Sequence, residues 1–190
     1  MATPPPAPIP VLVSRARAAA AAAGFPHSST DEVGRLLAAL AAAKPNGRIA
    51  ESGTGFGVGT AWLQAGLGDA ASLISVEHDL ARSKTAAGIF AGDNRIRILA
   101  GDWRLLEPHA PFDLFFCDGG GKRDAPDRVI ELLTGGGVLV LDDFTPSSGW
   151  PPTYQGQLDQ LRIRYLTDPR LLAAEVQVSP TQTVIVATRH

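Results

Sequence analysis

Hydrophobic and polar positions follow two different periods along the chain. Between residues 33 and 40 the apolar side chains recur at helical spacing, and the polar segment 28–31 before them offers an N-cap. From residue 48 onward, short apolar runs of strand length alternate with helix-like segments. The predicted strands are 48–51, 72–77, 95–100, 112–117 and 137–141. Continuous apolar runs such as 138–141 are typical of a parallel sheet that is covered on both faces.

The two ends of the chain complete this pattern. Helices are predicted over 11–23, from residue 31 to the turn at 44–47, and over 80–90, 126–133 and 158–165. One more helix is predicted between the strands 48–51 and 72–77, and it ends at about residue 67. Strands at 174–178 and 183–187 are joined by a short link, so they must pair antiparallel, because a parallel return needs a long crossover. The sequence therefore predicts an α/β fold with a Rossmann-like, doubly wound, mostly parallel sheet of seven strands, a C-terminal antiparallel hairpin and extra N-terminal helices.

Length and composition limit the class of protein. A chain of 190 residues can bury one core but is too short for two full domains, so we expect a single domain at 11–190 behind a flexible Pro-rich tail at 1–10. With 17 basic and 19 acidic side chains, the net charge of -2 predicts no strong field for nucleic acid or an anionic membrane. No apolar run approaches the ~20 residues that a membrane span needs.

Cysteine usage and the N-terminal segment bear on location. The single cysteine, Cys117, excludes an internal disulfide and a cysteine-based zinc cluster, and it fits a reducing cytoplasm. The segment before Asp31 lacks acidic residues and contains Arg15 and Arg17, as a transit peptide would. Its proline cluster blocks a helix from the start, however, which favours a frayed tail. We expect a cytoplasmic protein without membrane contact, and the sequence leaves a homodimer open.

A glycine-rich loop at 51–59 follows the first predicted strand. In a doubly wound sheet the ligand lies beyond the carboxyl ends of the strands, where glycines let it approach the backbone. The loop misses the dinucleotide pattern Gly-x-Gly-x-x-Gly in both registers, with Val58 or Thr60 at the third glycine position, and the chain has no Walker A sequence. Glu51 precedes the first glycine by two residues, and a carboxylate there suits a ligand with an ammonium or sulfonium group.

Five segments resemble, in order and spacing, the motifs of class I S-adenosylmethionine-dependent methyltransferases. They are 51–57, 75–77, 100–103, 112–119 and 133–143. In that family the glycine loop holds the cofactor, the acid that matches Glu77 holds the ribose hydroxyls, and the turn that matches 101–103 contacts the adenine. The resemblance therefore implies S-adenosylmethionine as the cofactor. The cofactor-binding residues that it implies are Ser29, Glu51, Gly53, Thr54, Gly55, Gly57, Glu77, His78, Gly101, Asp102, Trp103 and Asp118.

The chain most resembles the small O-methyltransferases related to catechol and caffeoyl-CoA O-methyltransferases, which begin with extra helices and lack inserted substrate domains. In that subgroup the residues that match Asp118, Asp142 and Asp143 bind a divalent metal, and oxygen ligands of this kind suit Mg²⁺. A lysine shortly after the first acid serves there as the base, and its counterpart is Lys122, one residue further along than expected. The resemblance thus implies Asp118 and Lys122 as catalytic residues. The Asp142-Asp143 pair also fits a strand-end turn that caps the next loop.

Several neighbouring residues fit two interpretations each. Trp103 either stacks on the adenine or covers the short helix after the third strand, and His27 is either a base or a surface residue. The aromatic segment 144–154 is either a substrate lid or a connection to the last helix. Cys117 ends an apolar strand, and we expect it to pack rather than to react.

The function that we expect is transfer of the methyl group of S-adenosylmethionine to a small-molecule hydroxyl of the phenol or catechol type. A methyltransferase acting on nucleic acid is one alternative. Its exocyclic-amine versions carry Asn/Asp-Pro-Pro-aromatic after the fourth strand, whereas this chain has Asp118-Gly119-Gly120 and no basic tract. A non-catalytic module that only binds S-adenosylmethionine is the other alternative, and the intact glycines argue against it. We therefore expect a small-molecule substrate and no nucleic acid.

Overall fold

The structure is a computed structural model that describes residues 8–190. The predicted tail at 1–10 falls largely on residues 1–7, which lie outside the described residues. The helices are α1 (Val11–Ala22), α2 (Asp31–Ala42), α3 (Val58–Ala65), α4 (Leu80–Phe90), the 3₁₀ helix η1 (Trp103–His109), α5 (Pro126–Glu131) and α6 (Gln160–Leu166). The strands are β1 (Arg48–Ser52), β2 (Ser72–Glu77), β3 (Ile96–Ala100), β4 (Phe112–Cys117), β5 (Leu133–Phe144), β6 (Thr153–Tyr154), β7 (Gln157–Leu158), β8 (Leu171–Gln177) and β9 (Thr183–Arg189).

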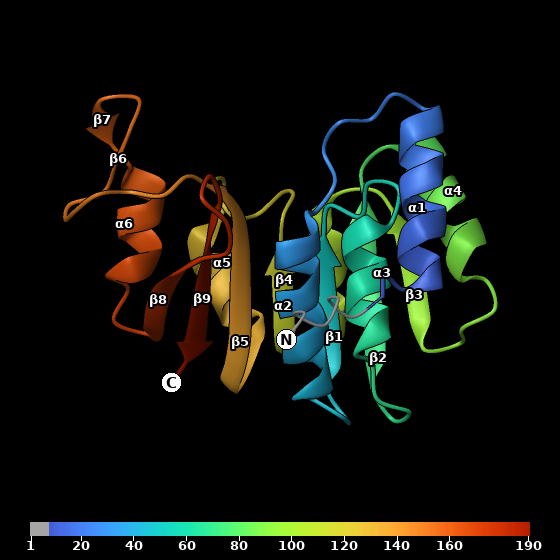
Figure 1. Cartoon of the computed structure of the whole chain (residues 1–190). Coiled ribbons are helices and arrows are strands. Elements are labelled where there is room, and N and C mark those ends of the chain that lie inside the picture. The colour runs from blue at the N-terminus through green and yellow to red at the C-terminus, as the bar shows by residue number, and fades with distance from the viewer. Residues whose placement is uncertain (1–7) are drawn as a thin grey trace, which may run out of the picture.

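The main sheet has seven strands in the order β3-β2-β1-β4-β5-β9-β8 (Figure 1). The strands from β3 to β5 pair in parallel, whereas β9 pairs antiparallel with both β5 and β8. The chain moves outward in one direction from β1 to β3 and in the other from β4 to β5, so the order reverses between β1 and β4. The predicted fold class is confirmed, and the reversal between β1 and β4 is where such sheets bind ligands.

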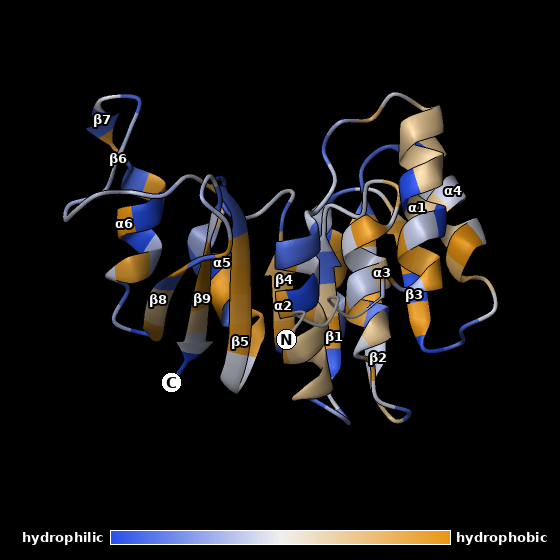
Figure 2. Ribbon diagram, viewed as in Figure 1, coloured by the Kyte–Doolittle hydropathy of each residue, from blue (hydrophilic) through white to orange (hydrophobic). Residues whose placement is uncertain are grey.

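Helices cover both faces of this sheet, and each face has its own hydrophobic core. Helices α1 to α4 contribute to the first core, and η1, α5 and α6 border the second. The central strands β4 and β5 are largely hydrophobic along their length (Figure 2), as strands covered on both faces require. Helices α2 and α3 pack closely, because a Cβ at Gly34 would lie 2.1 Å from the Trp62 indole nitrogen. A larger residue at Gly34 would therefore separate the two helices.

The structure differs from the predicted elements mainly near the C-terminus. Strand β5 begins at Leu133 instead of 137, because Leu133 already pairs with Phe112 of β4. The predicted helix at 126–133 consequently ends at Glu131. The hairpin of β6 and β7, which turns at Gln155 and Gly156 with positive φ at both, was not predicted. Strand β8 begins at Leu171, earlier than the predicted 174.

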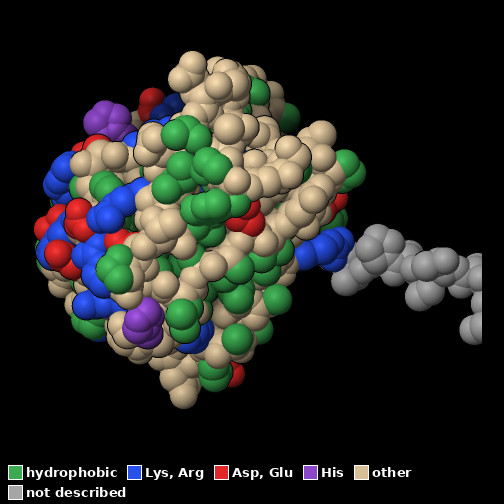
Figure 3. All heavy atoms as spheres, turned by 90° about the vertical axis from the view of Figure 1, so that its left-hand side faces the viewer, with side chains coloured by type: hydrophobic (Ala, Val, Ile, Leu, Met, Phe, Trp, Pro, Cys, Tyr) green, Lys and Arg blue, Asp and Glu red, His purple; other side chains and the backbone are tan. Residues whose placement is uncertain are grey.

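The segment 145–158, which we call the arm, projects beside α6 (Figure 1). Its base is held by Arg162 of α6, which is fully buried, donates to the Thr145 carbonyl at 2.6 Å and pairs with Glu175 of β8 at 3.0 Å. Trp150 and Tyr154 of the arm are exposed. Figure 3 looks onto this side of the molecule and shows hydrophobic side chains at the surface next to a dense group of charged ones. Within residues 8–190, no helix is long and apolar enough to cross a membrane.

Candidate active site

The loop after β1 lies against the loop after β4 so closely that only glycine fits at residue 53. A Cβ at Gly53 would lie 2.7 Å from the backbone nitrogen of Gly119, and the φ of Gly53 is +95°. The backbone amides of Asp118 and Gly119 donate to the carbonyl oxygen of Ser52 at 3.0 and 2.6 Å. The fold therefore joins the glycine loop to the loop after β4 at the point where the strand order reverses.

A cavity of about 620 Å³ opens at this point, at the carboxyl ends of the parallel strands. It combines the segment before α2 with the loops after β1, β2, β3 and β4, the end of β5 and the turn between β8 and β9. The predicted site residues that line it are Ser29, Gly53, Gly55, Glu77, His78, Gly101, Asp102, Trp103, Asp118, Asp142 and Asp143, and His27 lines it as well. Four further predicted residues, Glu51, Thr54, Gly57 and Lys122, are buried and are not among its lining residues.

The sequence analysis did not assign several lining residues to the site, among them Phe25, Arg82 and Gln182. Phe25 packs edge-on against Phe56, with 5.4 Å between ring centroids, and the Arg82 guanidinium lies 5.3 Å from the Phe25 ring. The sequence could have indicated Arg82, because a basic residue in the first turn of α4 lies close enough to pair with Glu77 at the end of β2. It gave no such indication of Gln182, which comes from the β8–β9 turn and whose amide donates to Asp142 Oδ1 at 2.9 Å.

Glu77 ends β2 at the cavity and organises its surroundings through both carboxylate oxygens. Oε2 accepts the backbone amide of Gly55 at 2.7 Å, which ties the glycine loop to β2. Oε1 accepts the Asp79 amide at 2.9 Å and two guanidinium N–H groups of Arg82 at 3.0 and 2.8 Å. Among the residues that the structure describes, Oε2 has one donor, so it retains capacity to accept a further hydrogen bond from a ligand.

Glu51 lies under the glycine loop instead of facing the cavity. Its Oε2 accepts hydrogen bonds from the hydroxyls of Ser75, at 2.5 Å, and Thr60. Its Oε1 has no hydrogen-bond partner within residues 8–190, and the side chain is 1% exposed. Burial raises the pKa of Glu51 from 4.5 to about 7, against the opposing effect of the two hydroxyls. The protonated acid is therefore substantially populated near neutral pH.

Three aspartates, Asp118, Asp142 and Asp143, form what we call the acidic end of the cavity. Burial raises the pKa of Asp118 to about 8, with further contributions from the neighbouring carboxylates and an opposing one from Lys122. Burial also raises the pKa of Asp142. Behind them, the Lys122 Nζ lies 2.6 Å from Asp143 Oδ2, 3.9 Å from Asp118 Oδ1 and 3.2 Å from the Asp142 carbonyl oxygen.

The donor set at the acidic end does not fit the divalent metal that the resemblance implies. Within residues 8–190, no three His, Cys, Asp or Glu side chains are arranged so that they could hold a metal ion. Asp142 Oδ1 is already engaged by Gln182 and by the backbone amide of Asp143 at 2.7 Å. A Mg²⁺ ion ~2.1 Å from Asp143 Oδ2 would lie within about 5 Å of the Lys122 ammonium, and the two cations would repel.

Trp103 and Cys117 complete the site. Trp103 is 5% exposed yet lines the cavity, and its indole donates to Asp124 at 3.3 Å. The ring packs so closely against the loop after β4 that a Cβ at Gly120 would lie 2.5 Å from it. Cys117 is fully buried, and burial raises the pKa of its thiol to about 11, so this residue packs behind the site.

Comparisons with known proteins agree with this geometry. The family model described as protein-L-isoaspartate(D-aspartate) O-methyltransferase (PCMT) matches residues 21–142. The probable O-methyltransferase Rv1220c of Mycobacterium tuberculosis is 35% identical over 163 residues, which cover 80% of this chain and 70% of that protein.

Solved structures have the same fold. The Bacillus cereus O-methyltransferase in complex with SAH matches with a TM-score of 0.80 at 21% identity, over 96% of this chain and 92% of that one. The O-methyltransferase TomG of Streptomyces achromogenes, solved in complex with SAM, matches with a TM-score of 0.75 at 21% identity, over 94% and 89% of the two chains. The chain therefore belongs to the PCMT family and is an S-adenosylmethionine-dependent O-methyltransferase.

Proposed function

We propose that this enzyme methylates a hydroxyl group of a small molecule, with S-adenosylmethionine bound along the loops after β1, β2 and β3. The observation that carries the proposal is the single cavity that unites the glycine loop, Glu77 and the acidic end. Ribose hydroxyls would donate to the free capacity of Glu77 Oε2, and the adenine would lie along Gly101, Asp102 and Trp103. His78 borders the ribose, and Ser29 and Gly53 border the methionine end.

Asp118 is the residue that we propose touches the reacting hydroxyl. When bound, S-adenosylmethionine supplies an electrophilic methyl group to an attacking oxygen. Asp118 lines the cavity directly after β4, where its deprotonated form, populated as the pH approaches its raised pKa of about 8, can orient the hydroxyl and accept its proton as the oxygen attacks. Lys122 is buried behind the carboxylates of Asp118 and Asp143, and its ammonium offsets their negative charge from the side opposite the cavity. The aromatic rings of Trp103 and Phe25 give the same cavity an apolar part of its lining.

Glu51, Thr54 and Gly57 would act on the cofactor indirectly, by shaping the loop that contacts it. The hydroxyl of Thr54 lies 2.5 Å from that of Ser75, which also bonds Glu51. This buried chain holds the loop against β2. The residues therefore support the cofactor pocket from below its surface.

The acidic end favours a hydroxyl acceptor over a carboxylate acceptor such as the isoaspartyl group in the name of the family model. An acceptor that carries a negative charge would have to approach three aspartates. A neutral hydroxyl meets no such repulsion and gains a proton acceptor there. The charge of the site thus supports a phenol or catechol type of substrate.

A methyl-transfer assay with labelled S-adenosylmethionine tests the proposal. The panel contains simple phenols, catechols, an isoaspartyl peptide and an unmodified transfer RNA. We expect turnover with members of the first two classes and a loss of at least tenfold in Asp118→Asn, which keeps the shape of the side chain. Turnover restricted to the peptide or the RNA would overturn the proposal. The cytoplasmic location stays a prediction of the sequence, which leaves a homodimer open.

A further inference from the structure

We propose that the Lys122 ammonium is the resident cation of the acidic end, and that methyl transfer by this enzyme needs no divalent metal. The inference rests on the proposed function, and it concerns the place that the resemblance assigns to a metal. Under this inference Lys122 is a positioning residue, because its side chain does not line the cavity. A base, by contrast, would have to reach the substrate.

The contacts of Lys122 are those of an ion that neutralises a site. The side chain is almost fully buried, with an exposed fraction of 6%. Its Nζ contacts Asp143 at 2.6 Å, the Asp142 carbonyl at 3.2 Å and Asp118 at 3.9 Å, so it faces an oxygen from each aspartate of the acidic end. A buried ammonium needs acceptors and counter-charges, and it finds hydrogen-bond acceptors in the Asp143 carboxylate and the Asp142 carbonyl, while the Asp118 carboxylate at 3.9 Å contributes opposite charge. Removal of Lys122 would leave the acidic end without that charge.

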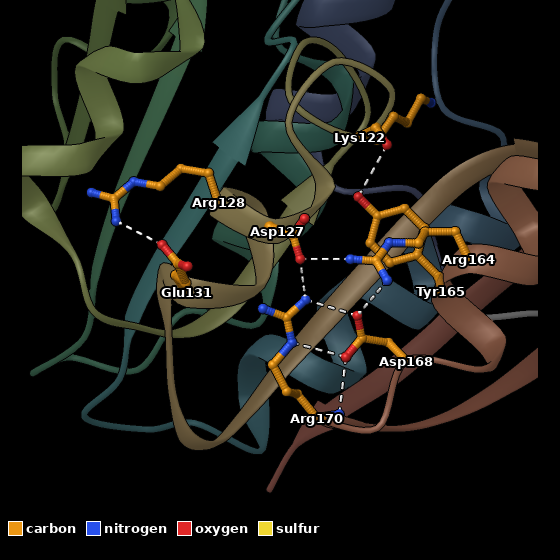
Figure 4. Close-up of polar contacts among 8 residues, drawn as sticks. All are labelled: Lys122, Asp127, Arg128, Glu131, Arg164, Tyr165, Asp168 and Arg170. Carbon is orange, nitrogen blue, oxygen red and sulfur yellow. Dashed lines mark hydrogen bonds and ion pairs between the residues drawn. The ribbon is translucent and has the colours of Figure 1, made fainter.

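The fold determines where this ammonium lies. The hydroxyl of Tyr165, a fully buried residue of α6, donates to the backbone carbonyl of Lys122 at 3.1 Å. Figure 4 shows the Lys122 side chain leaving this anchored carbonyl in the direction away from Tyr165. The neighbour of Tyr165 in the chain, Arg164, pairs with Asp127 of α5 at 2.5 Å and with Asp168 at 3.2 Å. The backbone of Lys122 is therefore held from α5 and α6, as a structural element and not as a mobile surface loop.

Three glycines between Asp118 and Lys122 explain how the lysine comes to lie behind the carboxylates. Gly121 has a φ of +103°, and its amide donates to Asp124 at 2.8 Å. The chain thus turns back after Asp118, and the side chain of Lys122 enters from the protein side. The carboxylates therefore remain open to the substrate hydroxyl on the side that faces the cavity. The positive charge that a metal would supply comes from the Lys122 ammonium.

Binding of Mn²⁺, followed by electron paramagnetic resonance on the full chain, tests the proposal without substrate. We expect no stoichiometric Mn²⁺ site in the wild type. Lys122→Met removes the charge at similar volume and should bind one Mn²⁺ per chain, at least tenfold more tightly than any residual binding by the wild type. Lys122→Arg keeps the charge and should behave like the wild type, as should Arg123→Met, which removes an exposed cation one residue away.

Activity gives the second measurement. Wild-type turnover should be unchanged in EDTA, whereas Lys122→Met should fall at least tenfold in EDTA and recover in part when Mg²⁺ is added. Circular dichroism and calorimetric titration with S-adenosylmethionine confirm that each variant is folded and retains its cofactor site. One Mn²⁺ bound per wild-type chain, or equal Mn²⁺ binding by Lys122→Met and Arg123→Met, would overturn the inference. A failure of the proposed function appears separately, as absence of cofactor binding or turnover in the wild type.

Discussion

Replacement of Glu51 by glutamine should change the pH dependence of stability in a defined direction. The carboxyl has an ordinary pKa of 4.5 and a pKa of about 7 in the folded protein, mainly because it is buried. Between these pH values the folded state holds a proton that the unfolded chain has released. Stability must therefore fall as the pH rises through this window.

The size of the effect follows from the two pKa values. At ~1.4 kcal/mol for each pH unit, the contribution of Glu51 to the free energy of unfolding should fall by about 3 kcal/mol between pH 4.5 and 7. Glutamine has nearly the same shape and does not titrate. Its amide oxygen can accept from Ser75 and Thr60, and its NH₂ group takes the place of Oε1, which has no hydrogen-bond partner within residues 8–190. The cost of that unpaired NH₂ is the same at every pH.

Urea unfolding followed by circular dichroism at several pH values from 5 to 8.5 measures the difference. Glu51→Gln should gain stability relative to the wild type as the pH rises, by about 3 kcal/mol across the range. Glu32→Gln, at an exposed carboxyl of α2, is the matched control and should show a far smaller change. If the free energies of Glu51→Gln and the wild type ran parallel over this range, the reasoning would be refuted.

Three further substitutions test other parts of the site. Gly53→Ala places a Cβ 2.7 Å from Gly119 at a φ of +95° and should weaken S-adenosylmethionine binding at least tenfold by calorimetry, whereas Gly88→Ala in α4, where a Cβ meets nothing within 4 Å, should bind normally. Glu77→Ala removes an almost fully buried charged acceptor and should cost ~1.5–3 kcal/mol of cofactor binding, or roughly ten- to a hundredfold; an unchanged dissociation constant would place the ribose elsewhere. Tyr165→Phe leaves the Lys122 carbonyl without its donor and should lower the free energy of unfolding by ~1–3 kcal/mol, and a melting temperature equal to that of the wild type would contradict the anchoring role.

Most elements of this fold are readable from sequence because their signals are local. β2 and α4 lie at the predicted 72–77 and 80–90, and the cap predicted within 28–31 is Thr30, whose hydroxyl accepts the Val33 amide at 3.4 Å. The start of β5 could not be read in this way. Glycines at 135–137 indicate a turn, but pairing with β4 extends the strand back to Leu133. A pairing partner more than 20 positions away leaves no mark in the local pattern.

The residues of the site likewise fall into two groups, those that the local sequence indicates and those that it does not. Ser29 lies in the predicted cap segment, Glu77 ends a predicted strand, and Gly53, Trp103 and Asp118 come shortly after predicted strands. All five line the cavity. The burial of Glu51 depends on which side of β1 its side chain occupies, and that of Lys122 on the path of a glycine turn. Gln182 enters from a hairpin at the far end of the chain. These placements depend on tertiary packing, which periodicity does not encode.

The burial of Cys117 makes the protein surface unreactive toward thiol-specific labels. The chain has a single cysteine, fully enclosed at the end of β4, and its raised pKa keeps the reactive thiolate scarce at neutral pH. A cysteine introduced at the exposed Trp150 would therefore take up a maleimide fluorophore alone. Fluorescence could then report whether the arm moves when cofactor and acceptor enter the cavity, in a protein whose native residues near the site are all intact.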